Sequence, residues 1–299
     1  MRRALEQWAG SRVSRAISQA SGFSPGVAAR LRFEDGRRLF VKAVGPAPNA
    51  DSPEMHRREA RIVSALPDSV PVPRLRWWLD DAETGWVVLV FHEIDGHHPA
   101  QPWRLDELDR VLTALYDLSS ALTPSPLGSD LVSTAADAVT RQLNGWRRLL
   151  KHPRPELDDW PQRHLKQLAA LEAEAPEAVK GNTLLHFDIR ADNLLLSHDH
   201  VWFFDWPHAR TGAAWVDVVF FAPSVTMQGG PPPEELIHRS VQFQAVDPHA
   251  IDAAIATIAG FFIYGSLQPP PPGIPTVRAF QAAQGRVACE WLAARTGWR

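Results

Sequence analysis

The first third of the chain alternates apolar and polar positions in a way that predicts a β-hairpin. The runs 27–33 and 38–44 have the composition of strands, and the Glu-Asp-Gly segment 34–36 between them is a turn sequence. The most apolar run of this part, 86–91, predicts a further buried strand. These patterns favour a small antiparallel sheet near the N-terminus.

Beyond this strand the apolar spacing becomes helical. Helices are expected at 105–122, 132–150, 161–175, 234–245 and 248–266. Pro176 is expected to end the third of them. Two proline-rich segments, 228–233 and 268–273, flank the last two helices and would be either walls of a pocket or plain connectors.

A short hairpin is predicted in the middle of the helical part. Leu194–Leu196 and 201–204 read as two strands around the polar turn 197–200. Because a hairpin brings its ends together, Asn193 and Asp205 are expected to lie side by side. Their oxygen atoms are the hard ligands that Mg²⁺ accepts, so both are candidate metal ligands.

The loop before this hairpin carries a candidate base, Asp188. An Asp, an Asn five positions later and an Asp after the next apolar run are how kinase-type sites supply one proton acceptor and two metal ligands. Each residue alone would more often cap a helix or close a turn, but the matched set favours a functional reading. His186 is expected to brace the loop rather than to perform chemistry.

The stretch His186-x-Asp188-x-x-x-x-Asn193, followed by Asp205, resembles the catalytic loop and metal motif of the aminoglycoside phosphotransferase superfamily. These enzymes are small-molecule relatives of protein kinases. The resemblance runs from about Ser21 to beyond Asp217 and is weakest in the C-terminal third. It implies an α/β, two-lobe protein-kinase-like fold.

The expected N-lobe, residues 1–95, would bind nucleotide with an antiparallel sheet and one helix. The expected C-lobe, residues 96–299, would be mainly helical and would carry the catalytic hairpin and the acceptor site. By the same resemblance, Asp217 would anchor the catalytic loop by accepting backbone N–H bonds, a role that also suits an Asp among apolar residues. The alternative is that Asp217 simply caps the N-terminus of a helix. Trp206, next to the metal Asp, would either shape the pocket or pack in the core.

One departure from the family pattern concerns Arg190. Such families commonly have His-Pro-Gly between the Asp and the Asn, whereas this chain has Arg190, Ala191 and Asp192. Arg190 is a candidate catalytic residue that would stabilise the transferring phosphate or pair with an acidic acceptor. Alternatively, it pairs with Asp192 or another acid.

Lys42 is the candidate phosphate-binding residue. It lies in an apolar strand, where an ammonium group is costly to bury unless it is paired. Glu59 lies in the segment 53–66, whose apolar positions have helical spacing and would pack on the sheet. Lys42 and Glu59 would then match the lysine–glutamate pair of the kinase fold; the alternative is two solvated side chains.

The remaining nucleotide contacts are expected at two places. Ser24 and Gly26 belong to a loop whose backbone N–H groups could approach phosphate oxygens. His92, Glu93 and Ile94 follow the buried strand 86–91 and resemble the hinge that meets adenine.

Composition fits an ordinary globular protein of two lobes. The chain has 299 residues, 45% hydrophobic and 22% charged. Cys289 is its single cysteine, so an intramolecular disulfide is excluded. No uninterrupted apolar stretch of membrane-spanning length and no signal peptide are evident, and a cytoplasmic location without membrane contact is expected.

Charge gives a weak indication about the acceptor. Residues 1–95 hold 14 Lys and Arg against 12 Asp and Glu, whereas 96–299 hold 17 against 22. This split suits a cationic or polyhydroxylated acceptor and argues against nucleic acid, although exposed helix faces produce similar splits.

The sequence therefore predicts an ATP- and Mg²⁺-dependent kinase that phosphorylates a hydroxyl of a small molecule, such as an aminoglycoside, another antibiotic or an amino sugar. The alternative is a catalytically silent nucleotide-binding module that regulates a partner. Protein kinase activity is disfavoured because no recognisable activation segment follows Asp205. The oligomeric state is left open.

Overall fold

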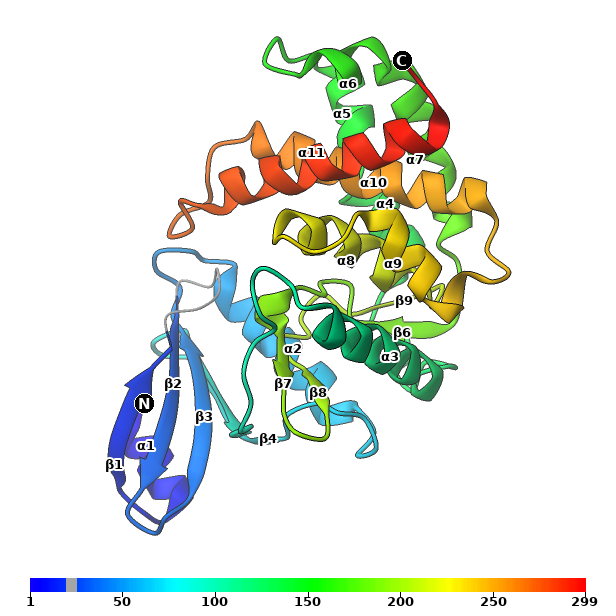
Figure 1. Ribbon diagram of the computed structural model, residues 1–299. Helices are drawn as coiled ribbons and strands as arrows, with labels where there is room; N and C mark the ends of the chain where they lie inside the picture. Colours follow the sequence, from blue (N-terminus) through cyan, green and yellow to red (C-terminus); the bar gives the residue numbers. More distant parts are fainter. Residues whose placement is uncertain (20–25) are drawn as a thin grey trace.

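The computed structural model describes residues 1–19 and 26–299, and it begins with an antiparallel sheet of order β1-β2-β3-β5-β4 (Figure 1). The strands are β1 Val13–Ser18, β2 Val27–Phe33, β3 Arg38–Val44, β4 Leu75–Asp81 and β5 Trp86–His92. The predicted strands β2, β3 and β5 are confirmed. Strands β1 and β4 were not predicted. They lie at the two edges of the sheet and are largely exposed, so neither has a long apolar run.

Helices α1 (Arg2–Ala9) and α2 (Ser52–Ala65) cover opposite faces of this sheet. Side chains of β5 alternate between the two sides, since Val88 and Val90 pack with α1 whereas Leu89 packs in the larger core that includes α2. The helix predicted around Glu59 is confirmed as α2. Glu59 on the buried face of this helix lies next to Lys42 of β3.

The C-terminal region is mainly helical, as predicted. Its helices are α3 Leu105–Ala121, α4 Ala135–Arg141, α5 Gly145–Lys151, α6 Asp159–Arg163, α7 Leu165–Ala178, α8 Val216–Met227, α9 Pro233–Arg239, α10 Pro248–Ser266 and α11 Val277–Thr296. Figure 1 shows α10 and α11 lying side by side above α8.

Several helix boundaries differ from the predictions. The single helix expected at 132–150 is two helices, α4 and α5, because the chain turns before Gly145. Pro176 lies inside α7, where the lost N–H bond is tolerated one turn from the helix end. The helix α9 stops at Arg239, and α11 was missed because its alanines, glutamines and glycine form no continuous apolar stripe.

Helix α10 is apolar along most of its length. By length and composition it is the one helix in the described part of the chain that could cross a membrane. Of its most apolar 18-residue stretch, 61% is buried inside the protein. It packs on α11, α7 and α5. A core helix of a folded domain has the same composition, and these contacts account for it.

The predicted hairpin at 194–204 is confirmed as β7 (Leu194–Leu196) and β8 (Val201–Phe203). A second two-stranded sheet pairs β6 (Thr183–Leu185) with β9 (Arg210–Gly212). The segment after β5 joins the hairpin through two backbone hydrogen bonds between His97 and Leu196. The division expected after residue 95 therefore falls in the segment that links the sheet to the hairpin.

A close backbone approach fixes α5 against α10. A Cβ atom on Gly145 would lie 1.8 Å from the carbonyl oxygen of Gly260, and backbone atoms cannot move aside easily. Gly145→Ala is expected to lower the free energy of unfolding by about 1–3 kcal/mol or more, as overpacking does. Denaturant unfolding measures this change.

The control for this experiment is Leu150→Ala, on the same helix at an exposed position. It should change stability by less than about 0.5 kcal/mol. Equal stabilities for Gly145→Ala and the wild type would contradict the close helix contact.

Candidate active site

A cavity of about 560 Å³ lies between the sheet and the β7–β8 hairpin. It collects most of the residues that the sequence selected: Gly26, Lys42, Glu59, His92, Glu93, Ile94, Asp188, Arg190, Asn193 and Asp205. The remaining predicted residue, Ser24, lies outside the described residues. Residues far apart in the sequence therefore line one cleft.

The ion cluster around Lys42 joins three elements. Its Nζ atom lies 2.7 Å from an oxygen of Glu59 on α2 and 2.6 Å from Oδ1 of Asp205 after β8. The expected Lys42–Glu59 pair is present, and Asp205 completes a bridge from the sheet to the hairpin. The side chain of Glu59 is 2% exposed and that of Asp205 is 35% exposed, so Asp205 is the more accessible of these two lining carboxylates.

Burial and charge act against each other in this cluster. Burial favours a neutral Lys42, but the two carboxylates outweigh it and raise the pKa of the lysine. Burial alone would also raise the pKa of Asp205, yet the Lys42 ammonium lowers it well below its usual range. Burial dominates at Glu59 and raises its pKa. Asp205 is therefore held ionised, as a metal ligand must be.

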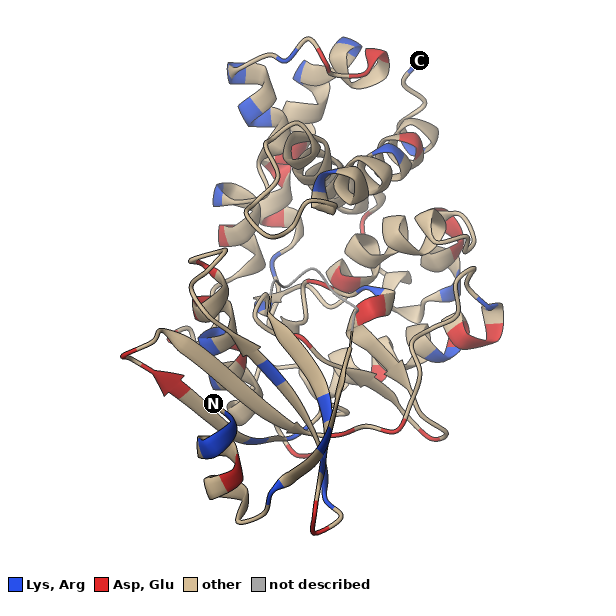
Figure 2. Cartoon of the chain, turned by 90° about the vertical axis from the view of Figure 1, so that its left-hand side faces the viewer, with Lys and Arg blue, Asp and Glu red and all other residues tan. Residues whose placement is uncertain are grey.

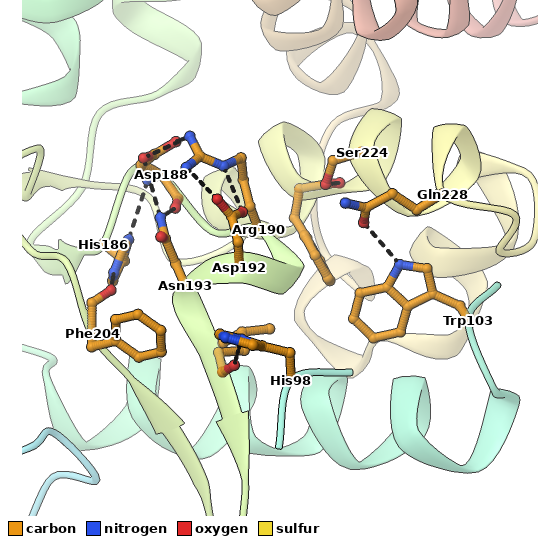
Figure 3. Close-up of polar contacts among 12 residues, drawn as sticks. His98, Trp103, His186, Asp188, Arg190, Asp192, Asn193, Phe204, Ser224 and Gln228 are labelled. Atoms are coloured by element: carbon orange, nitrogen blue, oxygen red, sulfur yellow. Dashed lines mark hydrogen bonds and ion pairs between the residues drawn. The ribbon is translucent and has the colours of Figure 1, made fainter. Parts of the chain in front are cut away.

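His186 stabilises the loop 186–193 through its ring nitrogens, as predicted. Its ring is fully buried, with Nε2 3.0 Å from the carbonyl oxygen of Phe204, and its Nδ1 accepts a bond from the N–H of Asp188. Burial lowers the pKa of His186 to about 4, so the ring is neutral near pH 7. These contacts tie the backbone of the candidate base to the end of β8 (Figure 3).

Asp217, near the start of α8, anchors the same loop. Its two carboxylate oxygens accept hydrogen bonds of 2.8 Å from the N–H groups of His186 and Phe187. The expected role of Asp217 is thus confirmed. Phe187 has φ 67°, an unfavourable conformation for a bulky residue, and the paired bonds from Asp217 hold it there.

The carboxylate of Asp188 lies between two side chains of its own loop (Figure 3). Asn193 Nδ2 donates to the Asp188 carbonyl oxygen at 2.8 Å and to Oδ2 at 3.2 Å. Arg190 Nη1 donates to both carboxylate oxygens of Asp188, at 3.0 and 3.1 Å. Its Nε and Nη2 atoms donate to the carboxylate of Asp192. The pairing of Arg190 with Asp192, one of the alternatives in the sequence, is present together with a contact to the base.

The ends of the β7–β8 hairpin meet as predicted, since the N–H of Phe204 donates to the carbonyl oxygen of Asn193. Asn193 commits its amide nitrogen to Asp188, which leaves the amide oxygen for another partner. Asp205 has φ 71°, and this conformation aims its side chain across the cleft toward Lys42. Both oxygen donors fit a magnesium ion.

Three or more His, Cys, Asp or Glu side chains do not form a metal-binding group anywhere in the described residues. Mg²⁺ needs no such group, because one or two protein oxygens suffice when water and phosphates supply the rest. The pair formed by Asn193 and Asp205 therefore fits this ion better than zinc.

The hinge residues lie at the cleft with different exposures. Ile94 is buried and His92 is exposed. The carboxylate of Glu93 is 2% exposed and is held by Arg32 at 2.9 Å and Arg38 at 3.0 Å. Because its side chain is bound to these arginines, Glu93 has its backbone rather than its carboxylate to offer a nucleotide base.

Sequence reasoning missed Phe40, which also lines the cleft. Phe40 lies two residues before Lys42 on β3, and alternate residues of a strand face the same side. Phe40 pairs with Phe91 of β5, the residue directly before the predicted hinge 92–94. The sequence signal that could have identified Phe40 was its spacing of two residues from Lys42 on a predicted strand.

Trp206 packs in the core, and the alternative that it shapes the pocket is wrong. Its side chain is fully buried, donates to the carbonyl oxygen of Phe203 and packs against the ring of His186 at an interplanar angle of 58°. The proline-rich segments also differ from one another. Gln228 accepts a bond from Trp103 and is not part of the cavity wall, whereas Ile274, next to the second segment, lines the cleft.

The fold is that of kinase-like phosphotransferases, a class of small-molecule kinases. The chain belongs to the phosphotransferase enzyme family, whose model matches residues 20–254. No curated protein sequence is significantly similar to it.

Solved structures of the same fold cover almost the whole chain at low sequence identity. A thermostable mutant of an aminoglycoside phosphotransferase, in a ternary complex with ADP and hygromycin B, has a TM-score of 0.65 and 14% identity, covering 99% of this chain and 98% of its own. A spectinomycin phosphotransferase with ADP and spectinomycin has a TM-score of 0.60 and 11% identity, covering 98% of both chains. An amicoumacin kinase with AMP-PNP and Ca²⁺ has a TM-score of 0.59 and 11% identity, covering 96% of this chain and 92% of its own.

The anchoring of the catalytic loop by Asp217 is testable. Asp217→Asn replaces one acceptor by an NH₂ group that faces a backbone N–H, so the free energy of unfolding should fall by about 1–3 kcal/mol. Amide hydrogen exchange at His186 and Phe187 should accelerate. Asp117→Asn, at an exposed position of α3, is the matched control. Unchanged exchange at both amides would rule out the anchoring role.

Proposed function

We propose that this protein transfers the γ-phosphoryl group of ATP to a hydroxyl of a small molecule in a Mg²⁺-dependent reaction. The observation that carries the proposal is the position of Asp188 in one cavity with Lys42, Asn193 and Asp205. That set provides a base, a phosphate-binding cation and two oxygen ligands for a metal. Phosphoryl transfer asks the protein mainly for positioning and charge neutralisation, which such a set supplies.

The reaction balances with these groups. The Asp188 carboxylate accepts the proton of the acceptor hydroxyl, while the hydroxyl oxygen forms a bond to the γ-phosphorus. The bond between that phosphorus and its bridging oxygen breaks, and ADP leaves with the electron pair. Asn193 holds Asp188 from its carbonyl and carboxylate sides, which supports its orientation toward the acceptor.

Nucleotide binding is assigned to the face of the sheet that carries Lys42. Lys42, oriented by Glu59, binds the phosphates. Gly26 lets the chain lie close to β3, because a Cβ atom there would be 2.5 Å from the carbonyl oxygen of Ala43. The adenine ring of ATP would lie near Phe40 and contact the backbone at 92–94. Asn193 and Asp205 would hold Mg²⁺, which neutralises phosphate charge when bound.

The acceptor is a small molecule with a hydroxyl group, and the class includes antibiotics and amino sugars. Activity in the cytoplasm follows from the need for ATP. A silent regulatory module is disfavoured, because such a module has no need to keep the base Asp188 and both ligands, Asn193 and Asp205, on one cavity wall.

The assignment of the base is tested by Asp188→Asn. The amide keeps the shape but cannot accept the proton, so kcat should fall about a hundredfold or more while the affinity for ATP changes little. Acceptor-dependent ADP release measures kcat, and calorimetry measures ATP binding. The screen uses aminoglycosides, amino sugars and nucleoside antibiotics as acceptors.

Asp199→Asn is the matched control, because Asp199 lies in the exposed turn of the same hairpin. It should keep wild-type turnover. Near-wild-type turnover of Asp188→Asn would remove Asp188 from the role of base.

The metal site is tested by Asp205→Ala and Asp205→Asn. Loss of the carboxylate should abolish the part of ATP affinity that depends on Mg²⁺, because the bridging ion loses its ligand. Calorimetric titrations with and without Mg²⁺ separate this effect from a general loss of nucleotide binding. Equal Mg²⁺ dependence in the variants and the wild type would place the metal elsewhere.

A further inference from the structure

His98 lies in the segment that links the sheet to the β7–β8 hairpin, and it lines the cleft. Its ring is bound to the hairpin, with Nδ1 2.9 Å from the carbonyl oxygen of Leu194 (Figure 3). The ring also packs against Phe204, with 6.1 Å between the ring centroids. Leu194 and Phe204 are the chain neighbours of the two candidate metal ligands, so the imidazole is held beside that end of the cleft.

The contact with Leu194 decides which ring nitrogen of His98 is left for a ligand. A carbonyl oxygen accepts hydrogen bonds and donates none, so Nδ1 is the donor in this contact. In the neutral imidazole, Nε2 then carries no hydrogen and acts as an acceptor. Within residues 1–19 and 26–299, nothing donates a hydrogen bond to this nitrogen.

The Nε2 atom of His98 is also open to the cavity. In the described part of the chain, the fully buried side-chain nitrogens and oxygens without a hydrogen-bond partner belong to Asn144, Arg210 and Gln284. Nε2 of His98 is not among them, so this atom is not fully buried. Because the Nδ1 edge of the ring is turned to Leu194, the opposite edge, which carries Nε2, is the one that faces the cleft.

Three other polar side chains near the hinge are turned away or already bound. Glu93 is held by arginines of the sheet, whose strands carry several Lys and Arg positions (Figure 2). The side chain of Asp95 is 86% exposed, and Asp95 does not line the cleft. His92 is paired with Leu39, which packs with α1, so its side chain points to the opposite face of the sheet. His98 is therefore the side-chain acceptor that this end of the hinge offers to the cleft.

The position of His98 along the cleft matches the sugar of a bound nucleotide. A nucleotide whose base contacts the hinge and whose phosphates reach the metal ligands has its ribose between these points, because the sugar joins the base to the phosphates. His98 follows the hinge residue Ile94 by four positions and is bound to Leu194, the residue after Asn193. A ribose hydroxyl carries the O–H donor that a free imidazole nitrogen accepts.

We propose that His98 is a specificity-determining residue of the nucleotide site, whose Nε2 atom accepts a hydrogen bond from a ribose hydroxyl. This inference rests on the proposed function and adds to it a preference for ribonucleotides over deoxyribonucleotides. The contact needs no movement of the side chain, because Leu194 and Phe204 already hold the ring. Little rotamer freedom is then lost when the nucleotide binds.

The first experiment compares three nucleotides on the wild-type protein. Calorimetry with Mg²⁺ measures the affinities for ATP, 2′-deoxy-ATP and 3′-deoxy-ATP. At least one deoxy analogue should bind about three- to tenfold more weakly than ATP, which is the effect of one neutral hydrogen bond. The weaker analogue identifies the hydroxyl that is bound. Equal affinities for all three nucleotides would overturn the inference.

The second experiment removes Nε2 and keeps the contact with Leu194. In His98→Asn the amide nitrogen replaces Nδ1 as the donor, and the shorter side chain has no atom at the place of Nε2. ATP should bind this variant as weakly as the discriminated deoxy analogue binds the wild type. That analogue should bind the variant and the wild type equally, because the lost bond is the same one. A preference for ATP that persists in folded His98→Asn would refute the inference.

His97→Asn is the matched control, on the neighbouring residue of the same segment. The side chain of His97 is exposed and does not line the cleft, and its Nδ1 lies 2.9 Å from the carbonyl oxygen of His98. This variant should keep the wild-type affinities for all three nucleotides, and melting temperatures verify that each variant is folded. An equal loss of the preference in His97→Asn would assign the effect to the segment as a whole and overturn the role of Nε2.

The two proposals fail in different ways, because nucleotide binding is measured without an acceptor. A wild-type protein that binds ATP and both deoxy analogues equally would leave the proposed function intact and remove this inference alone. A wild-type protein that binds none of the three nucleotides at millimolar concentration would remove the proposed function and the inference with it.

Discussion

The ion cluster of Lys42, Glu59 and Asp205 is the interaction on which the arrangement of the site depends. It connects β3, α2 and the end of the catalytic hairpin through contacts of 2.6–3.0 Å. Buried charges of this kind gain little net stability, because desolvation offsets the attraction between them. Removing one partner is costly, however, since it leaves a buried charge unpaired. The cluster therefore fixes geometry more than it adds stability.

A second set of contacts holds the catalytic loop against the helical region. Asp217 binds two backbone N–H groups, and the neutral ring of His186 connects the loop to Phe204. Together with the Lys42 cluster, these contacts place Asp188 and Asp205 on the same cavity. The fixed backbone allows a short loop to present these side chains to the cavity without large rearrangement.

Sequence and structure agree best where local spacing determines geometry. A hairpin folds its own ends together, so the proximity of Asn193 to Asp205 followed from the runs on either side of the turn. The strand around Lys42 and the helix around Glu59 were also visible in local periodicity. Boundaries were less predictable: Pro176 continued a helix and Gly145 began a new one, because packing against neighbouring helices outweighed local preference.

The sequence by itself determined the family resemblance, the β7–β8 hairpin and the residue types of the candidate site, because these depend on spacing within one segment. Only the tertiary structure decided how Arg190 is used, since Phe280 is distant in the chain and nothing in the sequence selects Asp188 over other acids as the arginine's second partner. It likewise decided that Trp206 packs in the core and that Glu93 turns its carboxylate toward Arg32 and Arg38. Contacts between distant segments form only when the chain is packed, so no local pattern encodes them.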